Sequence, residues 1–375
     1  MKESFIGLVF FALALFPVSG LSAATVPKVY ICPNCGCPND NQAFDKPGRC
    51  PGCGMQLIER TNEPVRPQTT VAVLLFDGVQ IIDYAGPWEA FGEAGFKVFT
   101  VAEKTGPIHA VYGQTLVPDY TFANAPRADI LLVPGGGGTH SAVQNDQLLK
   151  WVRERSNDSQ HVLSVCTGAF ILAHAGLLDG LSATTVSGAL DQLQEQAPKT
   201  KVVHDQRYVD NGKIITSAGL SSGIDGAFHL ISKIRGRGTA QNVALGMEYR
   251  WDPDSKFARA ALADRYLPDV EGVDAEILST EGDRERWKVN VLFTKPNTPA
   301  DVVELFSKRI VTATPHARGE VRLVPTTDKQ SDTHREMRWE FSDEQGKHWA
   351  GHGVADTDAQ PGKVQLTVQL EQSAG

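Results

Sequence analysis

A short apolar run that leads directly into a helical pattern constrains the fold of this chain more than any other stretch. Residues 162–165 are typical of a strand, residues 167–178 show the apolar spacing of a helix, and Cys166 lies between them. A strand that runs directly into a helix requires a tight turn. The residue at this turn directs its side chain into the crevice at the carboxyl ends of a parallel sheet. This arrangement is the nucleophile elbow, with cysteine in the place of serine.

The residues alone allow two interpretations of Cys166. The positive end of the following helix favours the thiolate, which is the reactive form of cysteine. A free cysteine is also commonly a small buried hydrophobe, so a role in packing alone stays open at this point.

The region around the elbow alternates between strand-like and helical segments. Strands are predicted at residues 71–76, 97–101, 130–133, 162–165, 202–209 and 213–217, with a hairpin-like extension at 108–115 and helices near 81–91, 141–155, 167–178, 217–234 and 240–249. Such alternation with short connections is typical of an α/β fold with a mostly parallel sheet and helices on both faces. We therefore predict one α/β domain over residues 71–255.

Two further stretches of this domain draw attention where strands end. Asp83 stands between apolar residues in the first strand-to-helix connection, where an acid is either a helix cap or a functional group. Residues 135–138 are four glycines directly after a strand, which lets the backbone approach a ligand closely and direct its N–H groups inward. A phosphate cradle is one interpretation, although the Lys-Ser/Thr of a P-loop is missing, and a flexible turn is another.

The stretch Ser-Val-Cys-Thr-Gly-Ala-Phe around Cys166, followed by Leu-Ala-x-Ala-Gly-Leu-Leu-Asp-Gly, resembles the ThiJ/PfpI family of the class I glutamine amidotransferase-like superfamily. The resemblance extends from about Thr70 to Asp252. Within the family, the sequence is most similar to the branch of isocyanide hydratases and of amidase-like sensor domains of AraC-type regulators. The resemblance implies a flavodoxin-like fold and a catalytic pair in which Asp83 faces Cys166.

The same resemblance implies which residues surround this pair. Gly136, Gly137 and the N–H group of Thr167 would form an oxyanion hole. The segment Ser-Ala-Gly-x-Ser-x-Gly-Ile-Asp, which begins with Ser217 and contains Gly219, would line the substrate site.

Two departures from the family pattern bear on the activity. Val186 stands where the family often has histidine, which removes a polar contact and leaves the substrate open. Thr167 replaces the histidine that follows the cysteine in the peptidase branch, which argues against a peptidase. We predict that Cys166 supports hydration or hydrolysis of a small electrophilic substrate, with no cofactor in the α/β domain. The alternative is a non-catalytic small-molecule or redox sensor, because sensor domains share the elbow.

The first residues follow the pattern of a secretory signal. Lys2 precedes an apolar run at residues 5–18, and the small residues Ser22-Ala23-Ala24 follow it. The run is short for a membrane span, although an uncleaved anchor is an alternative. We predict a signal peptide at residues 1–24 and a periplasmic or otherwise secreted protein with no stable membrane span after signal removal.

The net charge limits the partners. A formal charge of −8 and an isoelectric point near 5.7 argue against non-specific nucleic-acid binding. The sequence also shows no basic helix of the helix-turn-helix kind. We therefore expect no nucleic acid among its partners. The partners that we expect are a small-molecule substrate and a second copy of the chain in a homodimer.

Five of the six cysteines fall in one short module near the N-terminus. Cys32-Pro-Asn-Cys35 and Cys50-Pro-Gly-Cys53 are two Cys-x-x-Cys knuckles separated by fourteen residues. Four thiolates at this spacing suit zinc or another soft metal in tetrahedral geometry. Cys37 is left over, as a spare thiol or an alternative ligand.

This module, predicted over residues 28–58, resembles the small heavy-metal-binding domain of bacterial metal-efflux proteins. Asn34 and Cys35 stand where methionine and histidine are common, which moves the module toward a plain zinc ribbon. Disulfides are the alternative, because an oxidising compartment permits them. A module this small buries too few apolar side chains to be stable alone, so it needs either a metal or disulfides. A Pro-rich linker is predicted to follow at residues 59–70.

The composition of the chain changes beyond Pro268. Strands are predicted at residues 287–293, 337–341 and 364–370, a helix at 299–311, and turns at Gly346 and at residues 351–353. This predicts a small α+β unit over residues 270–372, whose role the sequence does not indicate. Its histidines do not fall at metal-ligand spacing.

Overall fold

The computed structural model describes residues 28–33, 37–40, 42–60, 68–255, 257–268, 273–295, 298–326 and 330–373. The chain divides into two compact units, Met1–Pro67 and Gln68–Gly375. The predicted signal peptide, Cys35 and residues 61–67 of the predicted linker lie outside the described residues. Within the described ranges, no helix is both long and apolar enough to span a bilayer.

The first unit contains a small antiparallel sheet. Its strands are β1 (Val29–Ile31), β2 (Ala43–Phe44) and β3 (Ile58–Arg60), in the order β2-β1-β3. The buried apolar core that is described consists of Cys32, Cys50 and Leu57, with Tyr30, Cys37 and Phe44 packed against it. Two of the three buried residues are cysteines, so few apolar side chains stabilise this unit.

The second unit begins with a seven-stranded sheet in the order β13-β14-β10-β9-β4-β5-β8. Its strands are β4 (Thr70–Leu74), β5 (Lys97–Ala102), β8 (Tyr120–Thr121), β9 (Ile130–Val133), β10 (His161–Val165), β13 (Tyr208–Asp210) and β14 (Ile214–Ser217). All neighbouring pairs are parallel except β13 with β14. Every residue of β9 and β14 is buried, as expected for parallel strands covered on both faces.

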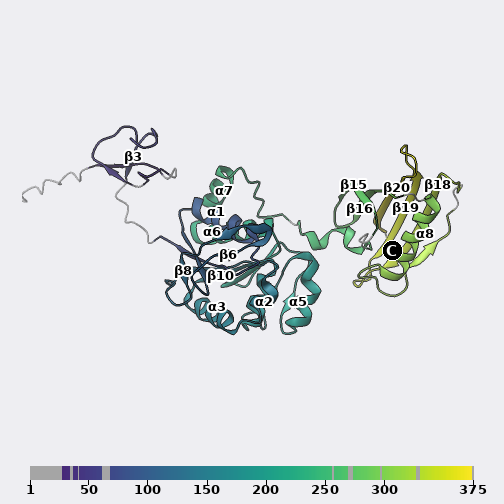
Figure 1. Ribbon diagram of the computed structural model, residues 1–375, viewed down its shortest axis with the longest axis horizontal. Coiled ribbons are helices and arrows are strands. Elements are labelled where there is room, and N and C mark those ends of the chain that lie inside the picture. Colours follow the sequence, from purple (N-terminus) through teal and green to yellow (C-terminus); the bar gives the residue numbers. More distant parts are fainter. Residues whose placement is uncertain are drawn as a thin grey trace, which may run out of the picture. The chain divides into compact units, whose positions relative to one another are not determined.

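Helices cover both faces of this sheet, so the predicted α/β fold is confirmed. Figure 1 shows α1 (Ile81–Glu93), α6 (Ser221–Arg235) and α7 (Arg237–Gly246) on one side of the sheet. On the other side lie α2 (Thr139–Ala142), α3 (Asp146–Asp158) and α5 (Leu190–Gln196), and α4 (Gly168–His174) contacts all three. Smaller elements complete the region, namely β6 (Ile108–His109), η1 (Val111–Gly113), β7 (Thr115–Leu116), β11 (Ser182–Ala183), η2 (Ser187–Ala189) and β12 (Lys201–Val202).

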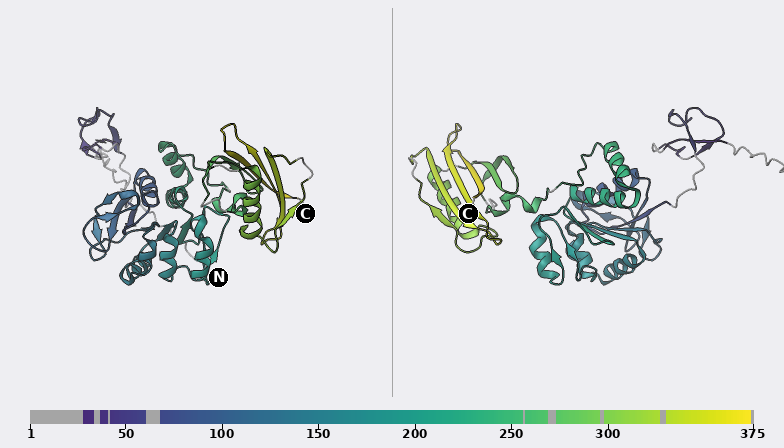
Figure 2. Two further views of the ribbon diagram at one scale, coloured as in Figure 1. Left: turned by 45° about the vertical axis from the view of Figure 1, so that its right-hand side comes forward. Right: turned by 180° about the vertical axis from the view of Figure 1, so that it is seen from behind.

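The C-terminal part of the second unit is an antiparallel sheet with one long helix, which confirms the predicted α+β region. The order is β15-β16-β20-β19-β18-β17, and α8 lies against the sheet in both views of Figure 2. Its elements are η3 (Arg259–Ala261), η4 (Ala263–Tyr266), β15 (Ala275–Gly282), β16 (Arg286–Phe293), α8 (Pro299–Ala313), β17 (Arg322–Val324), β18 (His334–Ser342), β19 (His348–Thr357) and β20 (Val364–Ser373). Trp339 and Trp349 are almost fully buried in its core with Phe306 and Ile310 of α8.

One prediction for this sheet is wrong. Residues 351–353 were expected in a turn, but Gly351 and Gly353 lie in the middle of β19. They pair with Trp339 and Met337 of β18, whose side chains fill the space that a β-carbon would need. The two glycines therefore make room for large core residues.

Candidate functional site

Cys166 lies at a strained turn between β10 and α4. Its φ of 57° is in the left-handed region, which costs energy for a residue that is not glycine. The hydroxyl of Thr185 donates to the Cys166 carbonyl at 2.7 Å and fixes the turn. Gly168 follows closely, and a β-carbon there would meet the carbonyl oxygen of Val133. The Cys166 side chain is buried, with 8% of the residue exposed.

The structure brings Asp83 to this sulfur from the first turn of α1. Asp83 is fully buried, and its carboxylate lies close enough to the Cys166 sulfur for each group to shift the pKa of the other. The N–H groups of Gly135 and Leu220 donate to the two carboxylate oxygens, each at 3.2 Å. Asp83 is not the cap of α1, because the N-cap position is Gln80.

Burial acts on the pKa values of both members of this pair. Desolvation raises the pKa of Asp83 to about 6, although the N–H groups of Gly135 and Leu220 act in the opposite direction. Desolvation and the Asp83 charge raise the pKa of Cys166 to about 12, against the N–H group of Thr167, which stabilises the thiolate. Desolvation and the Asp83 charge therefore oppose the helix N-terminus, which favours the thiolate. These pKa shifts favour a pair made of a carboxylate and a thiol at neutral pH.

The glycine run and Thr167 form a hydrogen-bonded support beside the sulfur. Gly136 N–H donates to Thr167 Oγ1 at 2.9 Å, and the hydroxyls of Thr139 and Thr167 lie 2.8 Å apart. In this structure the N–H of Gly136 is therefore engaged by Thr167, and its role as an oxyanion donor stays a prediction. Gly137 makes no such bond among the described residues, and the space beside its Cα is open.

Ser217 and Gly219, the two residues expected to line the site, differ in position. The Ser217 hydroxyl is buried and donates to the Ser164 carbonyl at 3.0 Å, so it supports the sheet. A β-carbon on Gly219 would lie 3.4 Å from Cys166 Sγ and 2.9 Å from Cγ2 of Val186. Gly219 and Val186 therefore form an apolar wall next to the sulfur.

The sequence did not indicate two residues that hold Asp83. Gly135 was recognised only as part of the glycine run, and its N–H group contacts the carboxylate. Leu220 has φ 56° and ψ −118°, an unusual conformation for leucine, and this directs its N–H group at Asp83. No residue type in the sequence signals such a conformation at a leucine.

A second constellation lies in the first unit. The Sγ atoms of Cys32, Cys37, Cys50 and Cys53 all lie within 4.8 Å of one another. Three of the separations are 3.5, 3.8 and 3.9 Å, and none of the four forms a disulfide with another described cysteine. Tetrahedral zinc with Zn–S bonds of about 2.3 Å places its sulfurs about 3.8 Å apart, so this donor set fits such an ion.

Cys37, for which the sequence left open a spare thiol or an alternative ligand, belongs to the cluster, whereas Cys35 lies outside the described residues. Desolvation raises the pKa of Cys50, but the N–H groups of Cys53 and Gly52 outweigh it and lower the pKa to about 6. A low pKa favours the thiolate that a metal requires.

Family models match the two regions of the chain that contain the Cys166 site and the cysteine cluster. The model of the DJ-1/PfpI family matches residues 69–233, and the model of the heavy metal binding domain matches residues 29–60. An isonitrile hydratase of Pseudomonas putida is 34% identical over 180 residues, which are 48% of this chain and 78% of the hydratase. The chain belongs to the DJ-1/PfpI family.

Other relatives in the family have different functions. The transcriptional regulator CdhR of Pseudomonas aeruginosa is 33% identical over 165 residues, which are 43% of this chain and 48% of the regulator. A crystal structure of a ThiJ/PfpI family protein from Pseudomonas syringae is 30% identical with a TM-score of 0.47, and the match covers 52% of this chain and 81% of that protein.

Proposed function

We propose that this DJ-1/PfpI protein is a cysteine-dependent enzyme that hydrates or hydrolyses a small electrophilic substrate, as an isonitrile hydratase does. The observation that carries the proposal is the close approach of the buried Asp83 carboxylate to the Cys166 sulfur at a strained elbow, where each group shifts the pKa of the other. The identity to an isonitrile hydratase supports the substrate class. Nucleophile and base stand side by side, as covalent catalysis requires.

In the first step Asp83 acts as the base. Its carboxylate accepts the thiol proton while Cys166 Sγ attacks the terminal carbon of an isonitrile, R–N≡C, and forms the C–S bond. Asp83 then returns the proton to that carbon, which gives a thioimidate, R–N=CH–S–Cys166. The N–H group of Thr167 stabilises negative charge on the sulfur as the proton leaves.

In the second step water releases the product. Asp83 accepts a proton from water as the oxygen adds to the thioimidate carbon, and it passes this proton to the nitrogen, which restores the carboxylate. The C–S bond then breaks, the hydroxyl proton returns to the sulfur through Asp83, and a formamide, R–NH–CHO, leaves. The net reaction is R–NC plus water to R–NH–CHO, and both residues return to their starting state.

The wall next to the sulfur supports a slender, apolar substrate. Val186 and the backbone of Gly219 lie against the nucleophile, and neither offers a charged partner. An isonitrile with a small apolar substituent matches this wall better than a charged amide.

A turnover assay on isonitriles, α-oxoaldehydes and small amides tests the proposal. Cys166→Ala and Asp83→Asn each abolish turnover, whereas the matched variants Cys37→Ser and Asp146→Asn retain it. Wild-type activity falls as the pH drops through about 6, because protonated Asp83 no longer accepts the thiol proton. Full activity of the Asp83→Asn variant would exclude Asp83 as the base.

The identity to a transcriptional regulator supports a second candidate, a domain that binds a small molecule without converting it. Saturable binding of an isonitrile or amide with no turnover, and equal binding by Cys166→Ala, would favour that candidate.

We also propose that Cys32, Cys37, Cys50 and Cys53 hold one zinc ion. The tetrahedral sulfur separations and the match to the heavy metal binding domain support this assignment. A thiolate-bound zinc ion has no redox chemistry, so its role would be to stabilise the first unit.

A further inference from the structure

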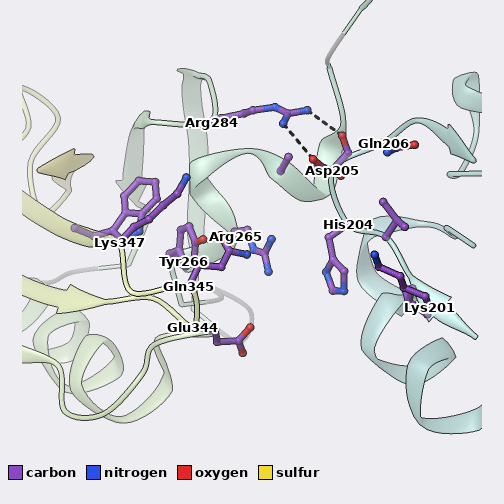
Figure 3. Close-up of a pocket in the computed structure, with 14 residues that line it drawn as sticks. Lys201, His204, Asp205, Gln206, Arg265, Tyr266, Arg284, Glu344, Gln345 and Lys347 are labelled. Atoms are coloured by element: carbon purple, nitrogen blue, oxygen red, sulfur yellow. Dashed lines mark hydrogen bonds and ion pairs between the residues drawn. The ribbon is translucent and has the colours of Figure 1, made fainter. Parts of the chain in front are cut away.

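A cavity of about 520 Å³ in the second unit, shown in Figure 3, has neither Cys166 nor Asp83 in its lining. Four segments line it: β12 with the loop that follows, the turn η4, the β15–β16 turn and the β18–β19 turn. They contribute several basic side chains, among them Lys201, Arg265, Arg284 and Lys347. The chain as a whole carries a net charge of −8, so this local excess of basic side chains is opposite in sign to the charge of the whole chain.

Both acidic residues of the cavity are already engaged. Arg284 donates to the Asp205 carbonyl at 2.9 Å and lies 3.9 Å from its carboxylate, and Figure 3 marks both contacts. Glu344 lies 3.4 Å from Nδ1 of His316. With Arg284 next to Asp205, the lining leaves three further cations, Lys201, Arg265 and Lys347, against the single carboxylate of Glu344.

Arg265 contributes a guanidinium to the lining of the cavity. Its guanidinium donates to the Ala260 carbonyl at 3.1 Å, while its buried Nε has no partner and no carboxylate pairs with it among the described residues. Figure 3 shows this guanidinium directed toward His204. Arg265 is half-buried, and its Nε atom is a buried donor without an acceptor, which requires an explanation.

Lys201 and Lys347 add further positive charge without acidic partners. Lys347 lies 3.5 Å from the side-chain oxygen of Gln372, and within the described part of the chain neither lysine pairs with a carboxylate. Desolvation and the positive charge of Arg265 lower the pKa of His204, although the carboxylates of Asp191 and Glu344 act in the opposite direction. Because the lining carries four Lys and Arg side chains and two carboxylates, the cavity favours an anion.

We propose that this cavity binds a small organic anion through a phosphate or carboxylate group, with Arg265 as the planar anchor and Lys201 and Lys347 as flanking charges. The guanidinium presents paired N–H groups in the geometry that oxyanions accept. The bound oxyanion would supply the missing counter-charge to Arg265. The site is separate from Cys166 and does not depend on the proposed reaction.

Isothermal titration of the full chain with inorganic phosphate, and separately with succinate, tests the site at low ionic strength. At least one of the two probes binds the wild-type protein. Arg265→Gln weakens its binding by tenfold or more, and Lys201→Gln weakens it several-fold. The control Arg322→Gln removes an arginine of β17 that is paired with Glu340 and does not line the cavity, and it leaves binding unchanged.

Lys201 is exposed, so Lys201→Gln keeps the test valid if Arg265→Gln does not fold. Binding of phosphate alone identifies a phosphate group as the natural ligand's anchor, and binding of succinate alone identifies a carboxylate. Cys166→Ala binds the anion as the wild type does. Absence of binding for both probes, or equal affinity in wild type and Lys201→Gln, overturns the proposal.

Discussion

At Cys166, burial and a neighbouring carboxylate act in the same direction on one thiol. Both disfavour negative charge on the sulfur, so at neutral pH the single charge of the pair resides on Asp83. The reactive thiolate then forms only while the proton moves to Asp83. Such a site protects the cysteine from indiscriminate reaction, because the nucleophile is the thiolate rather than the thiol.

Replacing Asp83 should therefore make Cys166 easier to alkylate even as it abolishes turnover. The Asp83→Asn change removes the charge that raises the Cys166 pKa, and each unit of lowered pKa increases the thiolate fraction about tenfold. We expect iodoacetamide to label Cys166 about tenfold faster at pH 8 in this variant. Mass spectrometry of the peptide that contains Cys166 measures the rate separately from the other cysteines. An unchanged or slower rate would mean that Asp83 does not control the thiol.

The sequence predicted which residues lie near Cys166 better than it predicted which acceptor each backbone N–H group contacts. Asp83 and Cys166 meet as the motif implied, but the N–H of Gly136 is bound to Thr167 and that of Gly135 serves Asp83. Adjacent glycines look equivalent in a sequence. Which N–H faces which acceptor depends on how two loops approach each other, and only the folded chain determines this.

At the scale of elements, the buried parallel strands were predicted because their apolar, β-branched runs are unmistakable. Strand β15 is almost wholly exposed, and β19 contains two glycines, so neither shows the alternation that identifies a strand. In β19 the packing requirement lies on the neighbouring strand. Large side chains of β18 occupy the positions opposite glycine, and a pattern confined to one segment cannot show this.

A methyl group at Gly351 should consequently destabilise the C-terminal sheet. The new β-carbon would overlap the indole ring of Trp339, which is fully buried and has no space to retreat. We expect Gly351→Ala to lower the free energy of unfolding by about 1–3 kcal/mol, as overpacking typically does. Urea denaturation followed by tryptophan fluorescence measures the loss.

The control for this change is Gly92→Ala. Gly92 lies near the end of α1, and a β-carbon there meets nothing within 4 Å. That substitution should be neutral or stabilising by up to about 1 kcal/mol. Wild-type stability in Gly351→Ala would show that Trp339 has more freedom than the packing indicates.

At the scale of the whole molecule, the two units differ in what stabilises them. The second unit buries extensive apolar clusters in its α/β and C-terminal sheets, whereas the described core of the first unit is largely a group of cysteines. A module this small gains little from apolar burial, so a bound metal would supply most of its folding free energy.

Metal removal should therefore unfold the first unit and leave the second intact. We expect the purified chain to contain one zinc-like ion, which a strong chelator removes together with the ordered structure of residues 28–60. The main thermal transition of the second unit, and any Cys166-dependent turnover, should not change, because its core contains none of the metal-binding cysteines. Elemental analysis gives the stoichiometry, and calorimetry with and without chelator separates the two transitions. Cys37→Ser should lose the metal, since its sulfur is part of the cluster, while Cys166→Ser should retain it. A full metal complement in Cys37→Ser, or two mapped disulfides in place of metal, would contradict the assignment of these four ligands.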